Sequence, residues 1–207
     1  MNYGINLRQE IVSDYQNPFL FSLNSSYKVA KNYIININGS KNHRVPTFND
    51  LYWSGAGASG NLAMNVQDVS QYGMELGFDW KRKWGNQELV WESEYAYTKS
   101  IDNTTKNQLL YVPEHMLRSN LAYQYKKLVA FYQFLYNGSV YTTTDNSDSL
   151  SSYTVGNIGL DYHWPNISGI KFILGLKVNN LFNKNYQNVA YRPMPNRNFQ
   201  LQLITKF

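Results

Sequence analysis

The residues that could carry acid–base, metal or nucleophilic chemistry are few and scattered along this chain. The histidines are His43, His115 and His163, and there is no cysteine. These histidines lack the short spacing of a metal site. Asp161 and His163 stand two residues apart and would share one face of a strand as an acid–base pair. No nucleophile motif, phosphate loop or dinucleotide fingerprint occurs. We therefore expect no enzymatic activity, no catalytic residue, no protein-bound metal and no cofactor.

Composition limits the class of protein. The 207 residues include 18 Tyr and reach 16% aromatic content, and the mean hydropathy is −0.49. No run of 18 apolar residues occurs, which excludes a transmembrane helix but not a barrel, where only alternate residues meet lipid. The net charge is +5, yet Lys and Arg are dispersed apart from the short run at 80–85. We therefore expect no nucleic-acid partner.

The elements that would position these residues are strands, because period-two alternation recurs and no helical period is sustained. The sequence predicts about ten strands, near 2–12, 19–29, 32–43, 70–83, 87–100, 114–126, 128–142, 151–164, 170–183 and 197–207. Each is long enough for the ~9–11 residues of a tilted membrane-spanning strand.

The large apolar residues of each predicted strand fall on one parity, and we assign that parity to the lipid. Examples are Tyr72, Met74, Leu76, Phe78 and Trp80, or Leu121, Tyr123 and Tyr125. The opposite parity holds the charges Arg8, Glu10, Lys28, Glu75, Asp79, Glu92, Glu94, Arg118, Asp161, Lys171, Lys177 and Lys206. A lipid-facing Lys or Arg at mid-depth costs ~2–4 kcal/mol, so a bilayer would impose this segregation. We therefore interpret Glu92, Glu94 and the Asp161–His163 pair as lumen lining.

The predicted connections alternate in length, as in outer-membrane barrels. Short turns are expected at 30–32, 84–86, 126–127 and 165–169. Longer loops are expected at 44–70, 101–113, 143–150 and 184–196. If the C-terminus is periplasmic, the long loops face the cell exterior. The fold class predicted is all-β, an antiparallel transmembrane β-barrel segment.

Three motifs carry a resemblance to a known family. The run Val178 to Tyr186 (VNNLFNKNY) is followed by PMPNRNF at 193–199 and a final Phe207. Arg44 to Trp53 reads RVPTFNDLYW, and 111–115 reads YVPEH. In this order and spacing they resemble the C-terminal part of TonB-dependent outer-membrane receptors. Asn196 stands where that family usually has Gly, and Asn also tolerates left-handed backbone.

The resemblance implies that residues 1–207 are the C-terminal portion of a barrel of ~22 strands with a plugged lumen. The plug domain and the earlier strands would then lie outside this sequence, as would a secretion signal, which the first residues do not resemble. The implied location is the outer membrane of a Gram-negative bacterium. The implied activity is uptake of a scarce nutrient such as cobalamin or a ferric siderophore. The implied partners are outer-membrane lipid, the barrel-assembly machinery and the TonB system, acting through the plug.

The candidate ligand-binding residues lie in two predicted loops. They are Arg44, Asn49, Asp50, Tyr52 and Trp53 in the first loop, and Tyr191 and Arg192 in the second. Tyr and Trp offer flat amphipathic surface, and the charged residues offer polar contacts. In the first loop the alternative interpretation is that Arg44 and Asp50 hold the loop's own fold.

The last strand carries a candidate barrel-assembly signal. Its residues are Phe199, Leu201, Leu203 and Phe207. The simpler interpretation is that these are only lipid-facing side chains. Two other functions remain open from the residues alone: an autonomous small outer-membrane barrel of ~8–10 strands, porin-like or an envelope enzyme, and a soluble all-β binding module.

Overall fold

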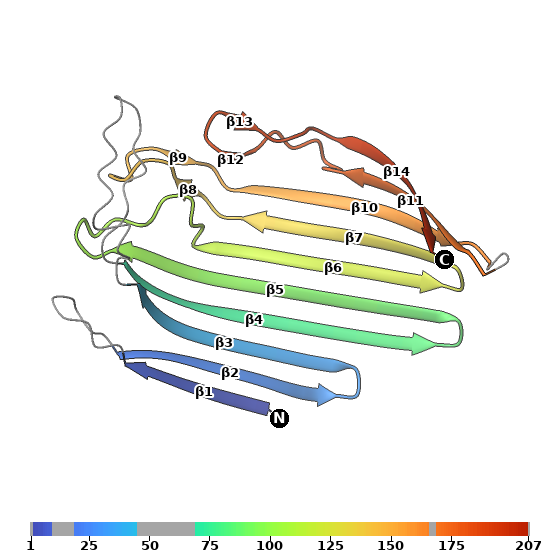
Figure 1. The fold of residues 1–207 in the computed structure, drawn as a ribbon, viewed down its shortest axis with the longest axis horizontal. Coiled ribbons are helices and arrows are strands. Elements are labelled where there is room, and N and C mark those ends of the chain that lie inside the picture. The colour runs from blue at the N-terminus through green and yellow to red at the C-terminus, as the bar shows by residue number, and fades with distance from the viewer. Residues whose placement is uncertain (1, 10–18, 45–68, 166–168, 207) are drawn as a thin grey trace.

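The computed structural model describes residues 2–9, 19–44, 69–165 and 169–206. Ten strands form one antiparallel sheet in the order β1-β2-β3-β4-β5-β6-β7-β10-β11-β14 (Figure 1). They are β1 (Asn2–Gln9), β2 (Phe19–Ala30), β3 (Tyr33–Arg44), β4 (Val69–Trp84), β5 (Gln87–Asp102), β6 (His115–Tyr125), β7 (Leu128–Asn137), β10 (Tyr153–His163), β11 (Lys171–Asn179) and β14 (Asn198–Lys206). The ten predicted strands and the all-β fold class are confirmed.

The sheet is an open wall. β1 and β14 lie at its two edges, and the described residues of these strands do not pair with each other. Strands that are neighbours in the sheet follow one another along the chain, as in a meander. The small β8–β9 pair lies in the connection between β7 and β10, and the β12–β13 pair lies in the connection between β11 and β14. Among the described residues, no helix has the length and apolar character needed to span a membrane.

Cross-strand pairing confirms the predicted separation of the two faces. Ile37 pairs with Leu76, and Leu76 pairs with Tyr95. Farther along, Leu121 pairs with Trp91 and with Tyr132. Partners in register share a face of the sheet, so the apolar sets of successive strands merge into one continuous surface. We call this surface the apolar face and the opposite one the polar face.

The short hairpin turns lie together at one edge of the wall, the turn end, and the longer connections lie at the other, the loop end (Figure 1). Tight turns after β4 and β6 place Gly85 at φ 55° and Lys126 at φ 53°. Such left-handed residues match the twist of short hairpins. The predicted turns at 30–32, 84–86 and 126–127 are confirmed. Residues 166–168 of the fourth turn lie outside the described residues.

The loop end differs from the prediction in detail. The strand predicted over 128–142 ends at Asn137, and Gly138 donates its N–H to the carbonyl of His115. Beyond it, β8 (Val140–Tyr141) pairs with β9 (Ser149–Leu150). The strand predicted over 170–183 ends at Asn179, because Asn180 has φ 49° and turns the chain. Farther on, β12 (Gln187–Val189) pairs with β13 (Arg192–Pro193). The sequence did not predict these two small hairpins.

Candidate functional site

The polar face contains a cavity of about 650 Å³. Its lining includes Asn36, Asn38, Glu75, Asp79, Glu92 and Arg118. Two amide–carboxylate hydrogen bonds cross from β3 to β4: Asn36 donates to Asp79 at 2.9 Å and Asn38 donates to Glu75 at 3.2 Å. The charged side chains of this lining suit contact with solvent and would be unstable against lipid.

Glu92 and Glu94 belong to this polar lining, as predicted. In register, Glu94 faces Arg118 on β6, and Glu92 faces Asn120. The other predicted polar pair, Asp161 and His163, is in β10, where the two residues pair with Gly175 and Ile173 of β11. Within the described ranges, no three His, Cys, Asp or Glu side chains are placed to hold a metal ion.

At the loop end, three connections are joined by hydrogen bonds between residues far apart in sequence. The Asn146 side chain pairs with both backbone groups of Gln108: the Gln108 N–H donates to Asn146 Oδ1 at 2.9 Å, and Asn146 Nδ2 donates to the Gln108 carbonyl at 3.0 Å. Asn107 also donates to the Thr144 carbonyl at 2.8 Å. These bonds hold connections 103–114 and 138–152 together as one platform.

The third connection, 180–197, joins this platform through tyrosines. Tyr153 donates a hydrogen bond to Asn188 at 2.7 Å, and its ring centroid lies 4.5 Å from that of Tyr186. Burial raises the pKa of Tyr186. Tyr111 reaches across from the first connection, and its hydroxyl accepts the Ala190 N–H at 3.4 Å. The three connections therefore form a loop platform over β6, β7, β10 and β11.

Asn180 is the buried anchor of the third connection, with only 3% of its surface exposed. Its Nδ2 donates to the carbonyls of Lys184 at 2.8 Å and Pro195 at 3.2 Å, and its Oδ1 accepts the Lys184 N–H at 2.8 Å. The Asn180 N–H donates to Asn157 on β10. Every polar group of this buried side chain is thus used to close the connection, as a buried amide requires.

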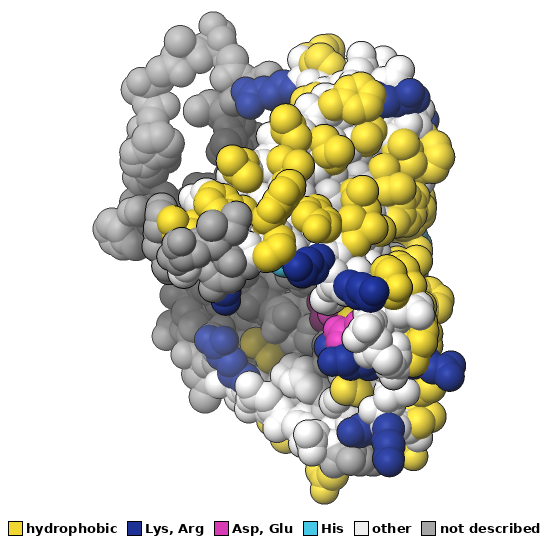
Figure 2. Space-filling model, turned by 90° about the vertical axis from the view of Figure 1, so that its right-hand side faces the viewer, with side chains coloured by type: hydrophobic (Ala, Val, Ile, Leu, Met, Phe, Trp, Pro, Cys, Tyr) yellow, Lys and Arg dark blue, Asp and Glu magenta, His cyan; other side chains and the backbone are white. Residues whose placement is uncertain are grey.

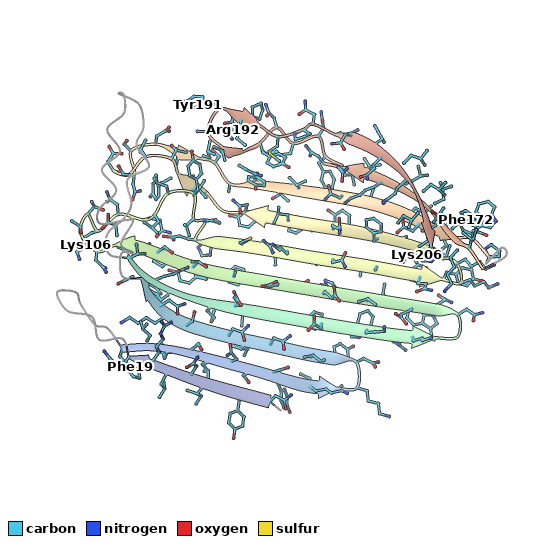
Figure 3. All side chains as sticks on the ribbon, viewed as in Figure 1. Phe19, Lys106, Phe172, Tyr191, Arg192 and Lys206 are labelled. Atoms are coloured by element: carbon cyan, nitrogen blue, oxygen red, sulfur yellow. The ribbon has the colours of Figure 1, made fainter. Side chains whose placement is uncertain are left out.

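The predicted binding residues Tyr191 and Arg192 lie at the tip of the β12–β13 hairpin, where Figure 3 labels them. Tyr191 is 92% exposed and has φ 64°. A left-handed conformation costs a side-chain-bearing residue roughly 1–2 kcal/mol. Local contacts offset this cost, because the Tyr191 N–H donates to Gln187 Oε1 at 2.9 Å. The hairpin therefore holds an aromatic side chain outward in a strained, defined conformation, a feature that clusters at functional sites.

The other predicted binding residues are not in this platform. Arg44 ends β3, where it pairs with Val69, and its side chain lies outside the described residues. Asn49, Asp50, Tyr52 and Trp53 also lie outside them. Their role in binding remains a prediction. The sequence analysis assigned no role to Asn146, which lies in a predicted loop, or to Asn180, which lies in the VNNLFNKNY motif but inside a predicted strand.

The loop connection 142–148 offers a pH test. Ser147 donates its hydroxyl to Asp145 Oδ1 at 2.7 Å and its backbone N–H to the same oxygen at 3.1 Å. These bonds, with one from Thr143, lower the pKa of Asp145 from 3.8 to about 2.

Because the folded pKa is depressed, ionised Asp145 stabilises its turn above about pH 4, and this contribution is lost as the pH falls toward about 2. We expect the Ser147 amide resonance to move through a single titration in that range. In Asp145→Asn the titration should be absent. A wild-type midpoint near pH 4 would contradict the carboxylate–hydroxyl contact.

The predicted assembly residues Phe199, Leu201 and Leu203 lie on the apolar face of edge strand β14. Phe199 pairs with Val178, and Leu201 pairs with Leu176. Phe199 is 77% exposed because β14 has a neighbour on one side only. Phe207 lies outside the described residues. A role in barrel assembly remains a prediction.

Comparison with known proteins agrees with this architecture. A family model described as TonB dependent receptor-like, beta-barrel, matches residues 62–181. No curated protein matches the chain. Among solved structures, the ferric yersiniabactin uptake receptor FyuA of Yersinia pestis aligns with a TM-score of 0.62 and 15% identity, over 99% of this chain and 34% of that one.

Two further structures share the fold. The ferric-catecholate import receptor Fiu of E. coli K12 aligns with a TM-score of 0.50 and 18% identity, over 90% of this chain and 34% of that one. The siderophore receptor PiuA of Acinetobacter baumannii has a TM-score of 0.50 and 15% identity, over 97% of this chain and 40% of that one. The chain thus spans about a third of the length of the structures it matches. Because the family model covers more than half of its length, the chain belongs to the TonB-dependent receptor-like β-barrel family, which comprises receptors and transporters of the Gram-negative outer membrane rather than enzymes.

Proposed function

We propose that this chain is the C-terminal part of the barrel wall of an outer-membrane receptor that takes up a ferric siderophore. The observation that carries the proposal is the family match together with the open ten-stranded wall. An unpaired strand edge at lipid depth costs several kcal/mol for each unsatisfied group, so β1 and β14 need further strands beside them. Earlier strands of a longer chain would supply them and enclose a plug, through which the TonB system would act.

The reading frame upstream of this sequence tests the larger architecture. It is expected to encode a plug domain and about a dozen further strands, to reach the ~22 strands of such barrels. An unrelated gene directly upstream would contradict the proposal and favour an autonomous small barrel.

Charge on the third connection of the loop platform favours an anionic ligand. Segment 180–198 contains Lys184, Arg192 and Arg197 and no Asp or Glu. Ferric complexes of catecholate chelators carry net negative charge, and two fold relatives are named for ferric-catecholate and ferric yersiniabactin uptake. We therefore place a ferric siderophore ahead of cobalamin, a ligand without that net negative charge.

Tyr191 and Arg192 are the described residues that we assign to ligand contact. The candidates within 44–53 are assigned to ligand contact from the sequence alone. An exposed aromatic ring next in sequence to a guanidinium offers stacking area together with a charged donor. Because interface Tyr and Arg residues often contribute ~2 kcal/mol or more, each alanine substitution is expected to weaken binding roughly thirty-fold.

The experiment is a binding titration of the full-length protein with a ferric triscatecholate, a neutral ferric hydroxamate and cyanocobalamin. We expect the catecholate to bind most tightly and Tyr191→Ala and Arg192→Ala to weaken it. The matched control is Lys106→Ala, which removes an exposed cation from the neighbouring connection (Figure 3). Tight binding of cyanocobalamin alone would overturn the siderophore assignment. Equal losses in Lys106→Ala would overturn the assignment of the hairpin tip.

A further inference from the structure

The basic residues of this chain are distributed unevenly between the two ends of the wall. The turns and strand ends of the turn end carry Lys28, Lys31, Lys81, Arg82, Lys83, Lys126, Lys127, Lys171 and Lys206, all of them exposed. The same segments contain two acidic residues, Glu88 and Asp161, and Glu88 pairs with Lys81 at 2.8 Å. Figure 2, seen from this end, shows the Lys and Arg side chains facing the viewer.

The loop end has a smaller excess of basic residues. Its described strand ends and connections carry eight basic residues, Arg8, Lys41, Arg44, Lys99, Lys106, Lys184, Arg192 and Arg197, and four acidic residues, Asp102, Glu114, Asp145 and Asp148. The turn end, with nine basic and two acidic residues, therefore has the larger excess of positive charge among the described residues. A cluster of charges of one sign creates a local electric field that attracts groups of the opposite charge.

Register separates the basic residues of the turn end into two groups. Lys28 pairs with Ile34, and Lys171 pairs with Lys206, on the polar face. Arg82 pairs with Leu89, on the apolar face. Lys31 lies at the tip of the β2–β3 hairpin and Lys126 and Lys127 at the tip of the β6–β7 hairpin, with the β4–β5 hairpin between them. Only Arg82 and these three lysines therefore border the surface that meets lipid, and we call them the turn-end cations.

Two of the turn-end cations lie over aromatic rings of the apolar face. The Arg82 guanidinium is 5.8 Å from the centroid of Trp84, and the Lys126 ammonium is 5.3 Å from that of Tyr125. Exposed Trp and Tyr rings settle at the boundary between hydrocarbon and headgroups. A cation held over such a ring is therefore fixed at the depth of the lipid phosphates.

From this arrangement we propose that the turn-end cations form a binding site for anionic phospholipid headgroups of the leaflet that surrounds the turn end. Adjacent hairpins repeat every two strands, which is roughly 10 Å, so the cations form a row along the membrane surface. Basic clusters beside a membrane-spanning element attract anionic lipid. The occupant is a phosphatidylglycerol-type lipid, which carries one phosphate at this depth and no compensating amine.

The experiment measures which lipids the full-length protein retains. The protein is reconstituted in nanodiscs of equal phosphatidylcholine and phosphatidylglycerol, and the lipids that stay bound after detergent extraction are counted by native mass spectrometry. Wild type is expected to retain phosphatidylglycerol preferentially, with the preference falling as salt rises. The variant Lys31→Gln, Arg82→Gln, Lys126→Gln, Lys127→Gln is expected to lose at least about ten-fold of this preference.

Two variants keep the result interpretable. The first is a loop-end variant that carries Lys106→Gln, Lys184→Gln, Arg192→Gln and Arg197→Gln. It removes the same charge from the loop end and should leave the preference for phosphatidylglycerol unchanged. The second carries Lys31→Arg, Lys126→Arg and Lys127→Arg. It keeps the charge and should keep the wild-type preference for phosphatidylglycerol, and it provides a comparison if the turn-end Gln variant fails to fold. An equal loss in the loop-end variant, an unchanged preference in the turn-end variant, or a stronger retention of added lipopolysaccharide would each overturn the proposal.

Discussion

Leu121→Arg is expected to destabilise the full-length protein in lipid vesicles by about 2–4 kcal/mol. Leu121 lies in the centre of β6 on the apolar face, 41% exposed between Trp91 and Tyr132. It lies five positions before the turn residue Lys126, which places it near mid-depth of the bilayer. An arginine there must enter hydrocarbon or distort the lipid around it. Unfolding by denaturant in vesicles measures the loss.

The control is the same substitution at the preceding residue. Asn120 lines the cavity of the polar face and pairs with Glu92. Asn120→Arg should therefore cost less than about 1 kcal/mol, because the new charge meets water and a carboxylate. Similar losses for the two variants would contradict the assignment of the faces, and a larger loss for Asn120→Arg would reverse it.

Asn180→Ala has the second largest expected effect, and it is local to the loop platform. The substitution removes three hydrogen bonds that together contribute about 2 kcal/mol, and it leaves an alanine at φ 49°, which costs about 1 kcal/mol more. Opening of segment 181–197 should become easier by about 3 kcal/mol, or roughly a hundred-fold in amide hydrogen exchange. Exchange in the middle of β10 and β11 should change much less.

Two comparisons separate the causes of this loss. Asn180→Gly removes the hydrogen bonds but tolerates the left-handed backbone, so it should recover about 1 kcal/mol. Asn185→Ala alters an exposed amide in the same segment and should have little effect. If Asn180→Ala exchanged like wild type, Asn180 would not be the anchor of this connection.

Much of the wall was predictable from the sequence, because the alternation of apolar and polar residues that identifies each strand is local and periodic. Alternation along single strands identified ten strands and the face that each presents, and register later joined those faces across neighbours. The turn at Gly85 was predictable for a similar reason, since short hairpins need residues that accept positive φ. Neither inference required contacts between distant residues.

The loop platform was not predictable in this way. Its bonds join Gln108 to Asn146 and Tyr111 to Ala190, residues 38 and 79 positions apart. Such pairings have no period, and Asn is equally common in turns that contact nothing. For the same reason the small hairpins and the true ends of β7 and β11 were missed. The predicted binding residues 44–53 lie outside the described part, so their contribution remains a prediction.

The sequence by itself determined the strand count, the separation of lipid-facing from polar residues and, through its motifs, the receptor family. The reason is that every second side chain of a strand faces the bilayer, and this constraint sets the alternation of apolar and polar residues along the sequence. Only the tertiary structure decided how the loop end closes around Asn180, how Tyr191 is held outward, and that the cations of separate hairpins form one row. Those features depend on which strands become neighbours, and that is set by the pairing of the whole sheet.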